Sequence, residues 1–253
     1  MMVHPAGADL LRMHAIAVQQ LWVEYHGEAA HAAAFPHKGR NALDAAVLGY
    51  VNIAALRQHI RPEERVHGIF TKAGDKPNIV PAHTSAQWYV RAATMKRLRP
   101  LAARVLACLR AGADAAGCTM EAEWKDPPYA DMLDNGPMLE LYVANARRLG
   151  RTVRDPDELD VQVVGSTDMG NVSYLVPSIH PMIAVSPPHV GIHTPEFAEH
   201  TVGGEADRAV LDGAKAMAMT IADLWLVPGA LEAARAAFLE AGGGVDPASD
   251  PVS

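Results

Sequence analysis

The pattern of apolar and polar positions predicts that strands and helices alternate in the first half of the chain. Residues 15–25 are rich in β-branched and aromatic side chains with partial alternation, which is typical of a strand. Residues 41–60 carry apolar side chains at spacings of three and four, so they predict a helix capped by Asn41. The same reasoning predicts strands at residues 65–71, 84–91 and 118–124, and a second long helix at residues 95–116.

These elements give the order β-α-β-β-α-β over residues 14–125. That order is the split βαβ, ferredoxin-like arrangement, in which two helices cover one face of an antiparallel sheet. We therefore expect a self-contained domain in this part of the chain.

The second half predicts helices at residues 137–149, 206–225 and 228–241, with a short strand at 161–164. Between them, residues 164–185 read VGSTDMGNVSYLVPSIHPMIAV, where small and polar residues precede an apolar run. We interpret this segment as a polar, glycine-lined loop that faces a site. Residues 242–253 are rich in Gly, Pro, Ser and Asp, and we expect them to be disordered.

Composition narrows the class of protein. Of 253 residues, 49% are hydrophobic and 20% charged, which indicates a globular protein rather than a disordered one. The formal net charge of −7 argues against nucleic acid as a partner. The only cysteines, Cys108 and Cys118, form no CxxC pair, so we expect a reducing, cytoplasmic setting. No apolar run approaches the roughly 20 residues that a membrane span needs, so no membrane partner is expected.

Of the twelve histidines, His4, His31, His180 and His193 have the most suggestive contexts, beside apolar runs, small residues or prolines. Imidazole is the commonest metal ligand and the usual acid–base group near neutral pH. No HxH or HExxH spacing occurs, so we expect any metal ligands to converge from separate segments. Glu63 and Glu64 are interpreted as part of a solvent-exposed turn. The residues alone indicate a site without naming its reaction.

Three stretches together resemble one family. They are VEYHGEAAHAAAFPHKGRNALDAAVL (residues 23–48), VHGIFTKAGDKPNIVPAHTSAQWYVRA (66–92) and GSTDMGNVSYLVPSIHP (165–181). They resemble the M20 metallopeptidases and amidohydrolases, nearest to the branch of aminoacylase-1-like proteins, peptidase M20 domain-containing protein 2 and aminobenzoyl-glutamate hydrolases. The resemblance implies an α/β catalytic domain with two metal ions, usually zinc, although manganese or cobalt is possible. It also implies a ferredoxin-like lid that forms a homodimer. The catalytic domain would comprise residues 1–13 and 126–241, and the lid residues 14–125.

The reaction implied by the resemblance is hydrolysis of the amide bond of a dipeptide or an N-acyl (aminobenzoyl-type) amino acid. A metal-activated water attacks and a glutamate acts as general base. By the same resemblance, His4 and His193 each ligate one metal, and His31 reaches into the partner's site to polarise the scissile carbonyl. The residues implied to hold substrate are Asn78, Arg91, Gly165, Ser166 and Thr167, with Asp168 bracing the loop.

The sequence departs from the family pattern in one respect. The first metal-ligand motif of the family and the Glu-Glu pair with the general base do not occur in it. A catalytic zinc usually has three protein ligands, so we expect this chain alone not to bind metal tightly or turn over substrate. We expect a truncated hydrolase or one whose missing half is supplied separately, and poor solubility from exposed apolar surface. The alternative is a non-catalytic dimerisation or ligand-binding module derived from such a hydrolase.

Overall fold

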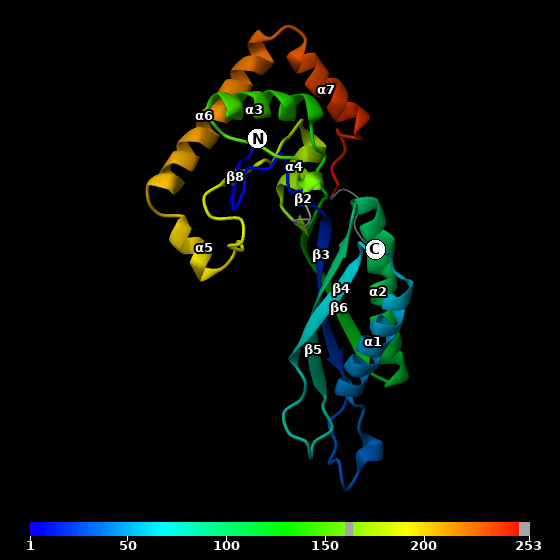
Figure 1. Ribbon diagram of the computed structural model, residues 1–253. Coiled ribbons are helices and arrows are strands. Elements are labelled where there is room, and N and C mark those ends of the chain that lie inside the picture. The colour runs from blue at the N-terminus through cyan, green and yellow to red at the C-terminus, as the bar shows by residue number, and fades with distance from the viewer. Residues whose placement is uncertain (160–163, 248–253) are drawn as a thin grey trace. The chain divides into compact units, whose positions relative to one another are not determined.

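The computed structural model describes residues 1–159 and 164–247, and it divides into two compact units. One unit, here called the lid unit, is the continuous segment Ile16–Tyr129. The other, here called the terminal unit, combines Met1–Ala15 with the chain from Ala130 onward. Their elements are labelled in Figure 1 and are described separately.

The lid unit confirms the expected ferredoxin-like arrangement. Its antiparallel sheet has the strand order β4-β5-β3-β6, and two helices lie side by side on one face of it (Figure 1). The elements are β3 (Ala17–His26), α1 (Ala42–Leu56), β4 (Arg65–Lys72), β5 (His83–Ala92), α2 (Met95–Ala115) and β6 (Thr119–Tyr129), with single 3-10 turns at Pro36–Lys38 and Arg57–His59.

Period-two and period-3.6 patterns explain this packing. Every second residue of β5 is buried, including Trp88 and Val90, because successive side chains of a strand point to opposite faces. The apolar stripe of α2 covers that face of the sheet. The two helices approach closely at Gly112, where a Cβ would lie 2.4 Å from the Ala45 carbonyl oxygen. Asn41 caps α1, as its spacing predicts, by accepting a hydrogen bond from the Leu43 amide at 2.9 Å.

The terminal unit consists of helices around two short parallel strand pairs. The helices are α3 (Gly136–Arg148), α4 (Met169–Leu175), α5 (Pro195–His200), α6 (Gly204–Leu226) and α7 (Ala230–Glu240), with a 3-10 turn at Pro156–Glu158. Strand β1 (His4–Ala6) pairs with β8 (Met182–Ala184), and β2 (His14–Ala15) pairs with β7 (Val164–Gly165). Helix α3 packs against α6 and α7 around a buried cluster that includes Leu139, Tyr142 and Ile179.

The structure corrects several expectations at the level of elements. Residues 164–185 are not one loop, because α4 and β8 lie within them. The lid unit does not begin at residue 14 or end at residue 125, since His14–Ala15 pairs with β7 and β6 continues to Tyr129. Of the strand expected at 161–164, residues 161–163 lie outside the described residues.

The tail also differs from the expected disorder in its first residues. The amides of Gly243 and Gly244 donate hydrogen bonds to the carbonyls of Phe238 and Tyr174, at 2.9 and 2.7 Å. Residues 248–253 lie outside the described part of the chain.

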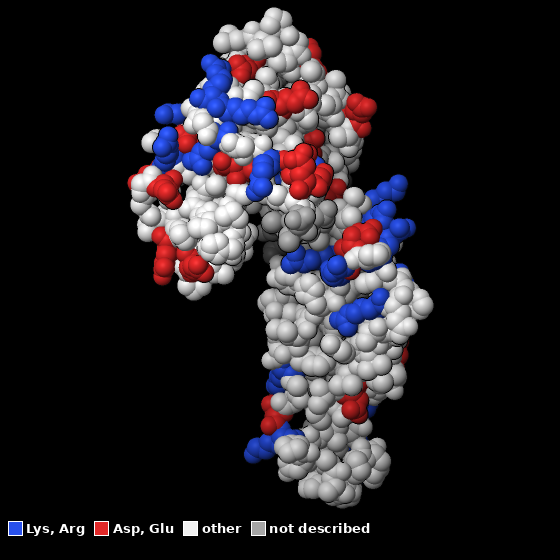
Figure 2. All heavy atoms as spheres, viewed as in Figure 1, with Lys and Arg blue, Asp and Glu red and all other residues white. Residues whose placement is uncertain are grey.

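Charge and hydropathy of the described residues add two facts. On the face drawn in Figure 2, Lys and Arg are interspersed with Asp and Glu on the terminal unit and are not gathered in one basic patch. None of the helices in the described ranges combines the length and apolar character needed to cross a bilayer.

Candidate functional site

His31 and Asn78 lie together in the lid unit, on two loops that pair with each other. The loop after β3 contains His31, and the loop between β4 and β5 contains Asn78. The amide of Ala32 donates to the Asn78 carbonyl at 3.0 Å, and His31 forms a bridge with Ile79. Both His31 and Asn78 are exposed. The resemblance implies that both residues contact the substrate, and the structure brings them to one end of the sheet.

The backbone around His31 sets the tautomer of its ring. Its Nδ1 accepts hydrogen bonds from the amides of Ala33 and Ala34, at 3.3 and 3.2 Å. A neutral imidazole has one donor and one acceptor nitrogen, so the proton lies on Nε2. The exposed Nε2–H is therefore a donor that can reach the oxygen of a bound carbonyl.

Arg91 lies at the opposite end of β5. Across the sheet it faces Val18 of β3 and Arg65 of β4. From His83 to Arg91 the strand rises about 27 Å at the usual rise per residue, so Arg91 is far from His31 and Asn78 in the same chain. Its Nε is buried without a hydrogen-bond partner among the described residues. The planar fork of a guanidinium is suited to bind a carboxylate.

In the terminal unit, Gly165 is the last residue of β7, and Ser166 and Thr167 follow it before α4. A Cβ at Gly165 would lie 3.0 Å from the Met13 sulfur, so the side chain of Met13 fills the space beside this glycine. Thr167 accepts a hydrogen bond from the Met169 amide through its hydroxyl, at 3.3 Å. Asp168 occupies the N-cap position of α4 without a side-chain capping bond. All three residues of the predicted loop are half-buried.

His4 lies on β1, and its ring is oriented by its own backbone. Its Nδ1 must donate to the Pro5 carbonyl, at 2.8 Å, because a carbonyl can only accept. Nε2 of the neutral ring then carries a free lone pair. Metal-binding histidines typically use this arrangement, in which one nitrogen donates to a carbonyl and the other binds the ion.

His180 has a suggestive context in the sequence but is not among the predicted site residues. It is buried, and its ring lies 5.8 Å from that of His4, edge to face. Burial chiefly, with His4 and the N-terminal amine, lowers the pKa of His180 to about 4, while Asp168 acts in the opposite direction. The ring is therefore neutral at pH 7. The signal in the sequence is the position of His180 at the end of an apolar run, immediately before Pro181.

His193 has an unusual backbone. Its φ is 66°, and it is the only non-glycine residue with a positive φ among those that the structure describes. Such conformations cost about 1–3 kcal/mol and are concentrated at functional sites. The side chain is exposed. Within residues 1–159 and 164–247, however, no three His, Cys, Asp or Glu side chains are arranged to hold a metal ion, so His193 and His4 do not form one such group.

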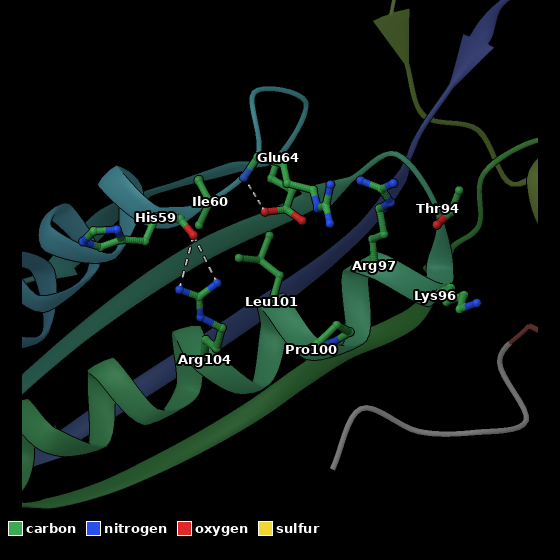
Figure 3. A pocket seen from close by; sticks show the side chains of 10 residues that line it. His59, Ile60, Glu64, Thr94, Lys96, Arg97, Pro100, Leu101 and Arg104 are labelled. Carbon is green, nitrogen blue, oxygen red and sulfur yellow. Dashed lines mark hydrogen bonds between the residues drawn. The ribbon is translucent and has the colours of Figure 1, made fainter.

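An open pocket of about 730 Å³ lies elsewhere on the lid unit and contains none of the predicted residues. Figure 3 shows His59, Thr94, Arg97 and Arg104 around it. The expectation that Glu64 lies in a solvent-exposed turn is wrong. Glu64 is buried, and it accepts a hydrogen bond from the Arg61 amide at 2.8 Å. Arg97 pairs with Glu63 at 2.7 Å. Since these charges are satisfied within the chain, we interpret this pocket as a structural groove.

Comparison with known proteins agrees with this description. Residues 18–116 match the M20 peptidase dimerisation domain. The chain is 39% identical over 237 residues to Xaa-Arg dipeptidase of Mus musculus, covering 94% of this chain and 55% of the relative. It is 27% identical over 286 residues to one of the subunits of p-aminobenzoyl-glutamate hydrolase from Escherichia coli K12, covering 90% of this chain and 59% of that protein.

A solved structure shares the fold. The aminobenzoyl-glutamate utilization protein of Klebsiella pneumoniae superposes with a TM-score of 0.67 at 18% identity, over 89% of this chain and 54% of that one. The chain spans about half the length of the curated relatives it matches. The matched dimerisation domain and the similarity to these hydrolases confirm the resemblance seen in the sequence: the chain contains an M20 peptidase dimerisation domain and is similar to M20-type hydrolases.

Proposed function

We propose that the protein containing this chain is a metal-dependent hydrolase of dipeptides. The observation that carries the proposal is the 39% identity to Xaa-Arg dipeptidase, because it extends over 94% of this chain. The bond cleaved is the amide between two amino acids, with an arginine on the carboxyl side as the first substrate to test. The weaker similarity to aminobenzoyl-glutamate hydrolase makes an N-acyl amino acid the second.

Three features of the lid unit support a substrate role. The exposed Nε2–H of His31 is a preorganised donor for the oxygen of the scissile carbonyl, which gains negative charge in the transition state. Asn78 lies beside it and supplies a second polar group. Arg91 has a guanidinium, whose planar fork is suited to the substrate carboxylate. Because Arg91 is far from the other two residues in one chain, we propose that it serves a different copy of the site in a homodimer.

His4 and His193 are proposed as the metal-binding histidines of this chain. His4 fits the role, since its ring presents a lone pair on Nε2 while Nδ1 donates to the backbone. A divalent ion, zinc in the first instance and manganese or cobalt as alternatives, would supply Lewis-acid catalysis. The loop Gly165–Thr167 is proposed to contact the substrate backbone.

A second candidate is a module that dimerises and binds ligand without hydrolysing it. It is favoured by the fact that the family match falls on the dimerisation domain. The two candidates differ in one respect: the module would bind a dipeptide and release it unchanged.

The test is a substrate panel on the protein isolated from its own cells, with each of the three metals added. Release of free amino acid from Xaa-Arg dipeptides, Xaa-Glu dipeptides and aminobenzoyl-glutamate is measured by mass spectrometry. We expect the Xaa-Arg dipeptides to be cleaved fastest. Binding by calorimetry without release of any product would contradict the hydrolase and favour the module.

A matched pair of variants tests the role of His31. His31→Ala removes the proposed donor, and we expect kcat to fall by about 10²–10³-fold with a small change in KM. His37→Ala removes a nearby exposed histidine of the same loop and should leave kcat unchanged.

A further inference from the structure

His180 is a buried imidazole whose two nitrogens have nothing to bond to. Only 1% of the residue is exposed. Neither Nδ1 nor Nε2 has a hydrogen-bond partner among the described residues. Leaving a buried donor or acceptor unpaired destabilises the fold, and an imidazole has one of each. An apolar side chain would fill the same space without that cost. We therefore expect the nitrogens of this ring to bind a ligand.

The position of this ring relative to His4 is fixed by the backbone. The amide of His4 donates to the Pro181 carbonyl at 3.0 Å, and the amide of Met2 donates to the Ile179 carbonyl at 3.2 Å. These bonds continue the parallel pairing of β1 with β8. The two histidines therefore lie on paired segments, and they cannot separate unless these hydrogen bonds break.

The two rings have the separation that a shared ion requires. With metal–nitrogen distances of about 2 Å, two imidazoles that bind one ion have ring centres about 5–6 Å apart. The centres of His4 and His180 are 5.8 Å apart, with an angle of 63° between the ring planes. His4 has its lone pair on Nε2, and His180 has both nitrogens free of other bonds among the residues described.

We propose that His180 is a further ligand of the divalent cation that His4 binds, so that the two imidazoles hold one ion between them. This inference rests on the proposed function, but it adds a residue outside the set that the family resemblance implies. Two histidines are too few for a complete site, so the remaining ligands come from other groups or from water.

The first test follows the histidine ring nitrogens directly and needs no activity. Protein labelled with ¹⁵N-histidine is titrated with zinc while long-range ¹H–¹⁵N spectra are recorded. We expect Nε2 of His4 and one nitrogen of His180 to shift together, at the same ratio of zinc to protein. A shift of His4 alone would overturn the role of His180 and leave the proposed function standing. If neither ring responds, this inference and the proposed role of His4 both fail.

The second test compares zinc affinity among matched variants. His180→Gln keeps the size and polarity of the side chain, and we expect it to weaken zinc binding about tenfold or more in competition with a chromophoric chelator. His4→Gln should weaken it at least as much, whereas His189→Gln, at an exposed histidine of the same unit, should have no effect. Urea unfolding of each variant separates lost binding from lost folding. Wild-type affinity in a folded His180→Gln protein would overturn the proposal.

Discussion

Asp134 shows how burial determines the charge of a single side chain. Burial raises its pKa to about 6, and the nearby Arg12 and His14 only partly oppose this. One of its carboxyl oxygens is buried without a hydrogen-bond partner among the described residues. Arg12 lies 3.9 Å from Asp134 but also 3.2 Å from Asp155, so its charge is shared.

This pKa predicts how stability changes with pH. The unfolded carboxyl titrates near pH 4. Between about pH 4 and 6 the folded protein keeps a proton on Asp134 that the unfolded chain loses. The contribution of Asp134 to the free energy of unfolding therefore falls as pH rises. Asp134→Asn should therefore raise the free energy of unfolding, relative to wild type, by about 1–2 kcal/mol more at pH 7 than at pH 4. Urea unfolding at both pH values measures this, with exposed Asp75→Asn as the control. A difference that does not change with pH would contradict the assignment.

Gly170 is a second residue whose environment leads to a prediction. It lies in α4, and a Cβ there would meet the Ala130 carbonyl oxygen at 2.0 Å. The obstacle is backbone, which cannot rotate away. Gly170→Ala should cost at least about 1–3 kcal/mol of unfolding free energy. Gly136→Ala, at a glycine with open space around it at the start of α3, should be neutral or stabilising. Equal stability of the two variants would contradict this packing.

At the scale of elements, the periodicity of apolar residues predicted those strands and helices whose own residues carry a regular pattern. The alternation of buried and less buried residues in β5 and the apolar stripe on α2 are sufficient to specify these two elements. Each of them buries one face against the other element. Strand β1 could not be predicted, since three residues carry no period and its partner β8 lies about 180 positions away. Helix α4 was missed because Gly170, Asn171 and Ser173 are poor helix formers in a seven-residue element.

The candidate site was predictable only in part, for a similar reason. The family resemblance implied roles for His31 and Asn78, and the pairing of their loops brings these two residues together. The resemblance did not reveal that β5 separates Asn78 from Arg91. His180 needed the structure, because only the pairing of β1 with β8 shows that its neighbour is His4.

Helix α6 carries an exposed apolar stripe. Val210, Ile221 and Trp225 recur at helical spacing along it, and Trp225 is 78% exposed. Contiguous apolar surface of this kind favours association. Replacing Val210 and Trp225 together with Gln should lower self-association several-fold in sedimentation velocity, whereas Lys215→Gln on the same helix should not. Unchanged association in the double variant would show that this stripe is not involved.

At the scale of the whole molecule, the opposite positions of His31 and Arg91 on the lid sheet predict sharing between two subunits. If His31 and Asn78 serve the partner's site, mixing two inactive variants should restore sites in mixed dimers. His31→Ala mixed with His193→Ala should recover up to about a quarter of wild-type activity, because half of the dimers are mixed and each has one intact site.

The control for this mixing experiment uses two variants of the same paired loops. His31→Ala mixed with Asn78→Ala leaves every site with one defective loop, so no activity should return. Recovery in this control, or none in the first mixture, would contradict a site shared between subunits.

The proposed metal-dependent hydrolysis is tested most directly by the rate at which an Xaa-Arg dipeptide releases arginine before and after metal removal. The protein isolated from its own cells is treated with a chelator, dialysed, and then supplied with zinc, manganese or cobalt. We expect release to stop on chelation and to return when a divalent ion is added. Release that persists in the metal-free protein, or no release under any condition, would contradict a metal-dependent dipeptide hydrolase.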